Sequence, residues 1–139
     1  MHTVFLALGS NLGDKIANLL NAYNLIQNRI GQITAQSDFI ISKPWGFQSD
    51  NNFVNSVVKV TTQLDPFELL HTTQQIERDL GRTSKSSNGL YHDRIIDIDI
   101  LIYDSISINT PELTIPHPHM KSRSFVTYPL SQIDDSYAD

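Results

Sequence analysis

The chain has 139 residues, 40% of them hydrophobic, which is enough for one globular domain with an ordinary core and argues against intrinsic disorder. Ten basic residues against fifteen acidic ones give a net charge of −5, which argues against a general binder of nucleic acid or anionic membranes. The sequence has no cysteine, so disulfide frameworks, thiolate zinc sites and cysteine nucleophiles are excluded. We therefore expect a single domain over residues 1–139 that acts in the cytoplasm as an enzyme or a binding module.

The N-terminal stretch predicts a strand followed by a helix. The apolar run Val4–Leu8 is typical of a buried strand, which stops at Gly9. Beyond a turn, apolar residues recur at helical spacing from Ile16 to Ile30, and Asp14 stands where the N-cap is expected. No apolar run is longer than the first one, which is far shorter than the roughly 20 residues of a membrane-spanning helix. We therefore expect no membrane association.

Two strands and a second helix are expected in the middle of the chain. Alternating polarity predicts a strand over 32–41, and β-branched residues predict another over Phe53–Thr62. The loop between them, 42–52, is long enough to suggest a functional role. Asp65-Pro66-Phe67-Glu68 is a strong helix start, with a cap, a proline in the first turn and a glutamate three residues after the cap. This helix is expected to end before Gly81.

The remaining elements complete a βαββαβ order. Residues 94–104 alternate in polarity, with Ile96, Ile98, Ile100 and Ile102 on one face and Asp97, Asp99, Leu101 and Tyr103 on the other. The tail from Pro111 onward is rich in proline and histidine, with a short helix near 120–132. The order is that of a ferredoxin-like α+β fold, an antiparallel sheet with two helices on one face, plus a C-terminal extension.

Asp97 and Asp99 are the most informative residues. On a strand they point to the same face, with their Cα atoms about 7 Å apart. Adjacent carboxylates repel unless cations sit between them, and Mg²⁺ prefers oxygen ligands together with substrate phosphates. For the isolated pair, a solvated strand face is an equally good interpretation. Arg82 and Arg94 favour a metal–polyphosphate complex, because guanidinium groups bind oxygens that a metal leaves available, although simple salt bridges are the alternative.

Other candidate residues are weaker signals on their own. Prolines on both sides of His117 hold its loop extended, so that its ring can face the sheet. Phe53 and Asn55 share a strand face, where an aromatic ring and an amide can bind a flat heterocycle, although on their own core and edge positions explain them better. Gln74 and Glu77 share a helix face, which usually means a solvated face. The segment Gly9-Ser-Asn-Leu-Gly13 is interpreted as a turn.

Taken together, these residues resemble the 6-hydroxymethyl-7,8-dihydropterin pyrophosphokinases of folate biosynthesis. The matching segments follow the family's order along nearly the whole chain: Ala7-Leu-Gly-Ser-Asn-Leu-Gly13, Pro44-Trp-Gly46, Phe53-Val-Asn55, Gln74-Gln-Ile-Glu77, Gly81-Arg82, Asp93-Arg94-Ile-Ile-Asp-Ile-Asp99, Ile115-Pro-His117 and Met120-Lys-Ser-Arg-Ser-Phe125. The resemblance implies a ferredoxin-like transferase that moves the β,γ-pyrophosphoryl group of ATP to the pterin's hydroxymethyl oxygen and releases AMP. It implies small-molecule substrates and no nucleic acid, and we expect a monomer.

The resemblance also implies a role for each matching residue. Asp97 and Asp99 would hold two Mg²⁺ ions that bridge the triphosphate and the acceptor hydroxyl. Arg82 and Arg94 would stabilise charge as the bond to the α-phosphate breaks. The ATP contacts would come from Gln74, Ile100, Thr114, His117 and Arg123. The pterin pocket would be formed by Ser42, Pro44, Trp45, Phe53, Asn55 and Phe125. Residues 82–92 would close over both substrates and exclude water.

An RNA-binding module and a phosphohydrolase are the two alternative functions. A ferredoxin-like module that binds RNA needs exposed aromatics on its central strands and a basic face, whereas this chain has a net charge of −5 and aspartates on the candidate face. A Mg²⁺-dependent phosphohydrolase could use the same pair of aspartates with water as the acceptor. It would release ADP and phosphate, whereas a pyrophosphokinase releases AMP, so the products separate the two enzymes.

Overall fold

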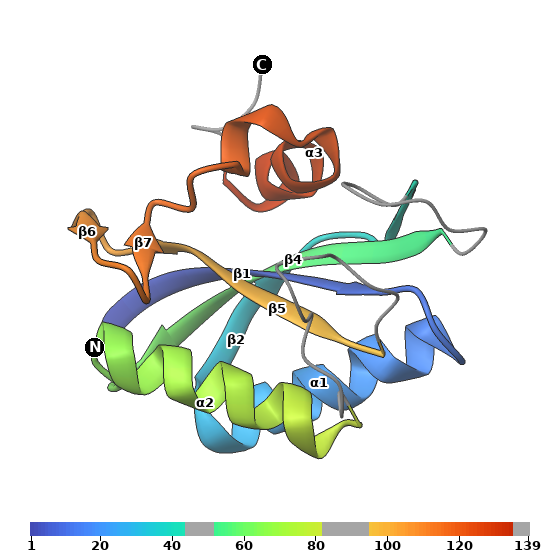
Figure 1. Ribbon diagram of the computed structural model, residues 1–139, viewed down its shortest axis with the longest axis horizontal. Helices are drawn as coiled ribbons and strands as arrows, with labels where there is room; N and C mark the ends of the chain where they lie inside the picture. The colour runs from blue at the N-terminus through green and yellow to red at the C-terminus, as the bar shows by residue number, and fades with distance from the viewer. Residues whose placement is uncertain (44–51, 82–94, 135–139) are drawn as a thin grey trace.

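The chain forms an antiparallel sheet with helices on both of its faces (Figure 1). The computed structural model describes residues 1–43, 52–81 and 95–134. The strands are β1 (His2–Ser10), β2 (Gly31–Gln36), β3 (Ile40–Ser42), β4 (Phe53–Thr62), β5 (Asp97–Tyr103), β6 (Ile108–Asn109) and β7 (Thr114–Ile115). The helices are α1 (Lys15–Arg29), α2 (Pro66–Asp79) and α3 (Ser124–Ile133), with a short 3₁₀ helix over Met120–Ser122. Within the described ranges, no helix has the length and apolar character needed to cross a membrane.

The order of the main strands in the sheet is β2-β4-β1-β5, and β3 also pairs with β4. All of these pairings are antiparallel. Figure 1 shows α1 and α2 against one face of the sheet and α3 over the other. The predicted ferredoxin-like α+β fold is therefore confirmed, and the C-terminal extension supplies β6, β7 and the expected short helix.

Both helices of the ferredoxin-like unit begin where the sequence predicts. The Asp14 side chain caps α1 and accepts the backbone N–H of Ala17 at 3.1 Å. At the start of α2, Asp65 accepts the N–H of Glu68 at 2.8 Å, while the Glu68 carboxylate accepts the N–H of Asp65 at 3.0 Å. These bonds satisfy N–H groups that have no acceptor within the first turn of a helix, so both start points are fixed locally.

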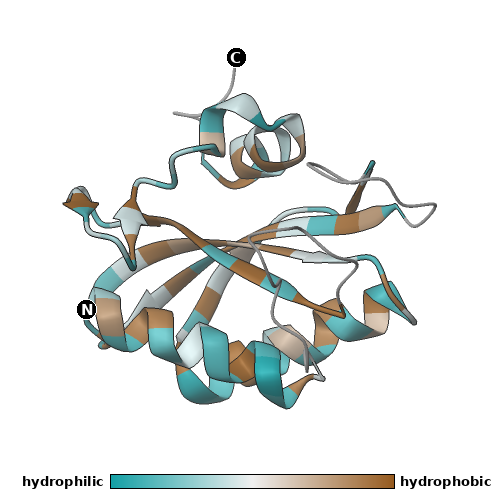
Figure 2. Cartoon of the chain, viewed as in Figure 1, coloured by the Kyte–Doolittle hydropathy of each residue, from teal (hydrophilic) through white to brown (hydrophobic). Residues whose placement is uncertain are grey.

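The sheet separates two apolar cores, because successive side chains of a strand point to opposite faces. Leu6 and Leu8 of β1 are buried in the core under α1 and α2. Phe5 turns to the other face and joins a second core with Val126 and Leu130 of α3. Figure 2 shows apolar residues along the strands between the two helical layers. The second core holds α3 against the sheet face that the ferredoxin-like unit leaves uncovered.

The alternation predicted along β5 is wrong beyond Ile100. Two consecutive residues of β1 pair with Ile100 and Ile102, so Leu101 is an extra residue that forms a β-bulge. Leu101 and Ile102 consequently both pack in the core under α3, and Tyr103 packs in the core under α1 and α2. The inserted residue shifts the alternation by one position. Ile102 and Tyr103 therefore lie on the faces opposite to those predicted.

Two predicted strand boundaries also differ. The strand expected over 32–41 is split into β2 and β3, because Ser37 between them bonds to Val57 through its own side chain. The Ser37 N–H donates to the Val57 carbonyl at 2.9 Å, and the Ser37 hydroxyl accepts the Val57 N–H at 2.9 Å. In addition, β1 continues through Gly9 to Ser10, so the first residues of the predicted turn belong to the strand.

The C-terminal extension is attached to β5 at the bulge. The backbone N–H of His117 donates to the carbonyl of Leu101 at 2.9 Å. The Leu101 side chain is 1% exposed and packs in the core under α3. The bulge therefore contacts the extension through both its backbone and its side chain, and it brings His117 next to the edge strand.

Candidate functional site

A hollow in the sheet face under α3 begins with the small residues of β1. Gly9 is paired with Asn55 of β4 on one side and with Asp97 of β5 on the other. In the neighbouring row, Ala7 is paired with Asp99. Because the central strand contributes only a glycine and an alanine here, the longer side chains on both sides border an open floor.

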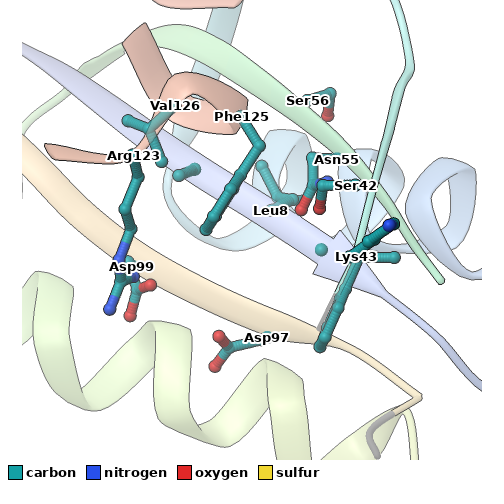
Figure 3. Close-up of a pocket in the computed structure, with 13 residues that line it drawn as sticks. Leu8, Ser42, Lys43, Asn55, Ser56, Asp97, Asp99, Arg123, Phe125 and Val126 are labelled. Carbon is teal, nitrogen blue, oxygen red and sulfur yellow. The ribbon is translucent and has the colours of Figure 1, made fainter. Parts of the chain in front are cut away.

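The residues around this floor form a cavity between the sheet and the start of α3 (Figure 3). We call it the sheet-face cavity. It is lined by Ala7, Leu8, Gly9, Ser42, Lys43, Phe53, Asn55, Ser56, Asp97, Asp99, Arg123, Phe125 and Val126. Strands β1, β3, β4 and β5 supply the floor and sides, and the first turn of α3 supplies Phe125 as an aromatic wall. One end is therefore aromatic and amide-bearing, and the other end is acidic.

Asn55 presents its side-chain oxygen to the floor of this cavity. Its Nδ2 donates to the Ser42 hydroxyl at 2.7 Å and to the Ile40 carbonyl at 3.3 Å, so β3 fixes the direction of the amide. A Cβ atom placed on Gly9 would lie 3.0 Å from the Asn55 Oδ1 and 3.2 Å from the Phe53 ring. The amide oxygen is thus an acceptor beside an aromatic ring, which suits the N–H edge of a flat heterocycle.

Two carboxylates and a guanidinium form the acidic end. Figure 3 shows Arg123 extending from the start of α3 toward Asp99 on β5, and Asp97 beside it on the same strand. Among the described residues, no group of three or more histidine, cysteine, aspartate or glutamate side chains could hold a metal ion. Two carboxylates nevertheless fit Mg²⁺, which commonly takes one or two protein carboxylates and completes its coordination with water and substrate phosphates.

A second cavity lies on the other side of Asp99. It is lined by Leu70, Ile98, Asp99, Ile100, Pro111, Glu112, Leu113, Thr114, His117 and Pro118. We call it the edge cavity, because β5 is the last strand of the sheet. Asp99 lines both cavities. Two ligands, one in each cavity, would therefore meet at a carboxylate, which is the geometry that a reaction between two bound substrates requires.

His117 lines the edge cavity as a neutral imidazole. Burial lowers its pKa to about 4, and the positive charges of Arg123 and His119 act in the same direction, while Asp97 opposes them. The His117 Nδ1 accepts the backbone N–H of His119 at 3.2 Å, so the neutral ring carries its proton on Nε2. His117 is thus a neutral hydrogen-bond donor to a ligand at pH 7.

The lowered pKa of His117 predicts a specific dependence of stability on pH. Between about pH 6.5 and 4 the unfolded chain binds this proton and the folded chain does not. Stability contributed by this residue is therefore complete above pH 6.5 and is lost as the pH falls toward 4. We expect His117→Gln to reduce the slope of the free energy of unfolding against pH in this range, measured by urea titrations. His71→Gln, an exposed histidine on α2, is the control; equal slopes for wild type and His117→Gln would contradict the assignment.

Most of the residues that the sequence singles out come together in the two cavities. The sheet-face cavity contains Ser42, Phe53, Asn55, Asp97, Asp99, Arg123 and Phe125. The edge cavity contains Asp99, Ile100, Thr114 and His117. Gln74 is exposed on α2 and lines neither of these two cavities. Four of the predicted site residues lie outside the described part of the chain: Pro44, Trp45, Arg82 and Arg94.

Six residues of the sheet-face cavity are not among the predicted site residues: Ala7, Leu8, Gly9, Lys43, Ser56 and Val126. Ala7 and Gly9 form its floor, and Lys43 lies at its exposed rim. A glycine after an apolar run usually ends a strand, so the sequence predicts a turn at Gly9. Its pairing with both Asn55 and Asp97 becomes visible only once the strand order is known.

Three comparisons with known proteins bear on this site. The family described as 7,8-dihydro-6-hydroxymethylpterin-pyrophosphokinase matches residues 5–135. The 2-amino-4-hydroxy-6-hydroxymethyldihydropteridine pyrophosphokinase of Porphyromonas gingivalis is 48% identical over 134 residues, which cover 96% of this chain and 91% of the relative. The enzyme of the same name from Aquifex aeolicus is 41% identical over 134 residues, 96% of this chain and 81% of the relative.

A solved structure supports the fold. The chain resembles wild-type Plasmodium falciparum HPPK-DHPS, solved with pteroate, with a TM-score of 0.75 and 14% identity. The match covers 94% of this chain and 40% of the longer one. At this level of identity the likeness concerns the fold alone, and it agrees with the strand order described above.

Proposed function

The chain belongs to the 7,8-dihydro-6-hydroxymethylpterin-pyrophosphokinase family, and on that premise we propose that it transfers pyrophosphate from ATP to 6-hydroxymethyl-7,8-dihydropterin and releases AMP. The family acts in folate biosynthesis, and the chain is accordingly a transferase of the diphosphokinase class. The observation that carries the finer proposal is the position of Asp99 between two cavities, one suited to a flat heterocycle and the other opening beside a neutral histidine.

The pterin occupies the sheet-face cavity in this proposal. The Asn55 Oδ1, held by Ser42, accepts an N–H of the ring. Phe53 and Phe125, which line the same cavity from β4 and α3, pack against its faces. The resemblance adds Pro44 and Trp45 to this pocket. The hydroxymethyl group then points toward the acidic end, because the amide that orients the ring lies at the opposite end.

The nucleotide occupies the edge cavity, with its phosphates directed toward Asp99. Ile100, Thr114 and His117 line that cavity, and the proton on the His117 Nε2 can be donated to a phosphate oxygen. Arg123 extends toward the same carboxylate from α3 and can bind a phosphate from the other side (Figure 3). The resemblance adds Gln74, which the structure places on α2 outside both cavities, and the two arginines Arg82 and Arg94.

Asp97 and Asp99 are the proposed ligands of the two Mg²⁺ ions, which neutralise phosphate charge and polarise the β-phosphate when bound. In the transfer, the pterin oxygen bonds to the β-phosphorus and loses its proton to solvent, while the bond between that phosphorus and the oxygen of the α-phosphate breaks and AMP leaves with this oxygen. The walls of both cavities align the two substrates. Cationic side chains stabilise the charge on AMP as it leaves.

Analysis of the nucleotide products tests the proposal. The protein is incubated with Mg²⁺ and ATP, with and without 6-hydroxymethyl-7,8-dihydropterin, and the nucleotides are separated by ion-exchange chromatography. AMP formed only with the pterin is the expected result. ADP and phosphate formed regardless of the pterin would instead identify a phosphohydrolase. Absence of turnover in a folded protein that binds neither substrate would favour a non-catalytic module.

The floor of the sheet-face cavity gives a separate prediction. In Gly9→Ala, the new methyl group would lie 3.0 Å from the Asn55 Oδ1 and 3.2 Å from the Phe53 ring, so both must shift. Overpacking of this kind costs about 1–3 kcal/mol. A loss of the same size in the free energy of pterin binding would reduce pterin affinity about 5- to 150-fold. Isothermal titration with each substrate checks this. Nucleotide affinity serves as the internal control, and unchanged pterin affinity would show that the ring does not rest on Gly9.

A further inference from the structure

Glu77 is a buried carboxylate that the proposed chemistry does not use. It lies on the inner face of α2, is 6% exposed, and is the one acidic residue among the buried residues of the described ranges. A buried carboxylate is strongly unfavourable unless hydrogen bonds compensate for its lost hydration. The Glu77 Oε2 accepts the backbone N–H of Ile98 at 2.8 Å. The backbone of Ile98, between the two aspartates, is therefore bonded to the carboxyl group of Glu77 on α2.

The position of Ile98 makes this bond important. Strand β5 is at the edge of the sheet and pairs with β1 on one side. Alternate N–H groups of an edge strand point away from its partner and need another acceptor. Ile98 is such a residue, and Glu77 occupies the place where a further strand would pair. Asp97 is the first residue of β5, so this bond lies at the end of the strand, where fraying is otherwise expected.

We propose that Glu77 is a positioning residue, which fixes the backbone between Asp97 and Asp99 and thereby sets the separation and direction of the two carboxylates. The proposal rests on the proposed metal-binding function of that pair. The two aspartates are in register with β1, opposite Gly9 and Ala7, and the intervening Ile98 is bonded to α2. The segment is thus held from both sides, which pre-organises a ligand pair on an edge strand. Groups that orient metal ligands commonly alter metal affinity strongly when removed.

Two substitutions separate positioning from charge. Glu77→Gln removes the charge but keeps an oxygen that accepts the Ile98 N–H, whereas Glu77→Ala removes the acceptor. Thr73→Ala is the matched control for destabilisation, because Thr73 is a buried polar residue on the same helix whose hydroxyl donates to the Leu70 carbonyl. Its loss perturbs α2 without removing the bond to β5.

Two quantities are measured. The first is the dissociation constant of Mn²⁺, determined by electron paramagnetic resonance in the presence of an ATP analogue with an α,β-methylene bridge. The second is the rate of amide hydrogen exchange at Ile98. We expect Glu77→Ala to weaken Mn²⁺ binding on the order of 10- to 100-fold and to accelerate exchange at Ile98. Glu77→Gln should stay within about threefold of wild type in Mn²⁺ affinity, as should Thr73→Ala.

Three results would overturn the proposal. Equal losses in Glu77→Gln and Glu77→Ala would assign the effect to charge instead of position. Faster exchange at Ile98 with unchanged Mn²⁺ affinity would show that the bond stabilises the strand end without affecting the ligands. A wild-type protein that binds no Mn²⁺ with the analogue would refute the metal site itself, and this outcome is distinct because it appears before any substitution is made.

Discussion

Asp99→Ala is expected to reduce turnover on the order of 10³-fold or more while leaving the fold intact. Asp99 lines both cavities, so its carboxylate borders both substrates in the proposed arrangement. Asp99 is the cross-strand partner of Ala7 and belongs to neither apolar core. The substitution therefore removes no core packing. Turnover is measured as pterin-dependent AMP release, and folding as the circular dichroism spectrum with its thermal midpoint.

Asp79→Ala is the matched control for this experiment. Asp79 is an exposed carboxylate at the end of α2, bonded to Arg29 at 2.5 Å, and it lines neither cavity. An exposed ion pair of this kind contributes little to stability, so Asp79→Ala should keep both turnover and fold. A nearly unchanged rate for Asp99→Ala with an intact spectrum would remove Asp99 from the metal site and leave the acidic end of the cavity without its proposed role.

Asn55→Ala is expected to weaken pterin binding about 10- to 100-fold while nucleotide binding is unchanged. The substitution removes the Oδ1 that faces the floor and leaves the ring N–H without its acceptor, a loss of about 1–3 kcal/mol for a buried hydrogen bond. Asn55 lines the sheet-face cavity but not the edge cavity, so the two ligands should respond differently. Isothermal titration with each ligand separately measures both affinities.

Ser42→Ala provides the comparison for Asn55. The Ser42 hydroxyl holds the amide nitrogen at 2.7 Å but does not supply the oxygen that faces the ring. Its removal should therefore reduce pterin affinity less than removal of Asn55 itself. Equal losses for pterin and nucleotide in Asn55→Ala would mean that the pterin pocket is misplaced, since a specific contact cannot weaken both ligands to the same extent.

Features that depend on neighbours in the sequence could be predicted. The reciprocal bonds between Asp65 and Glu68 join residues three positions apart, and period-two geometry is enough to place Asp97 and Asp99 on one face. The order of the elements predicted the ferredoxin-like fold, and the resemblance identified the pyrophosphokinase family to which the chain belongs. The two cavities themselves could not be predicted, because they depend on which strand lies beside which and on where α3 docks.

The different burial of Gln74 and Glu77, and the bulge at Leu101, could not be predicted from spacing alone. Gln74 and Glu77 are one helical turn apart and share a face in the simplest description, yet Gln74 is exposed and Glu77 is buried against β5. Three residues advance a helix by less than a full turn, so the side chains of Gln74 and Glu77 point in different directions around the helix axis. Glu77 is therefore the one that reaches the edge strand. The bulge at Leu101 is a similar case, since no local signal marks an extra residue in an otherwise alternating strand.

The bulge at Leu101 separates the part of β5 that carries the two aspartates from the contacts that hold the C-terminal segment, which matters for protein design. The pairs on both sides of Leu101 are in register with β1, so deleting this residue would leave a regular ladder and keep the aspartate pair in place. It would also remove the carbonyl that accepts the His117 N–H and a side chain buried under α3. Leu101 is thus one of the residues that join the ferredoxin-like scaffold to the appended segment that carries His117, Arg123 and Phe125, together with Phe5, Val57 and Ile102 of the core under α3. A designer could exchange that segment for another cover while leaving the carboxylates of the scaffold unchanged.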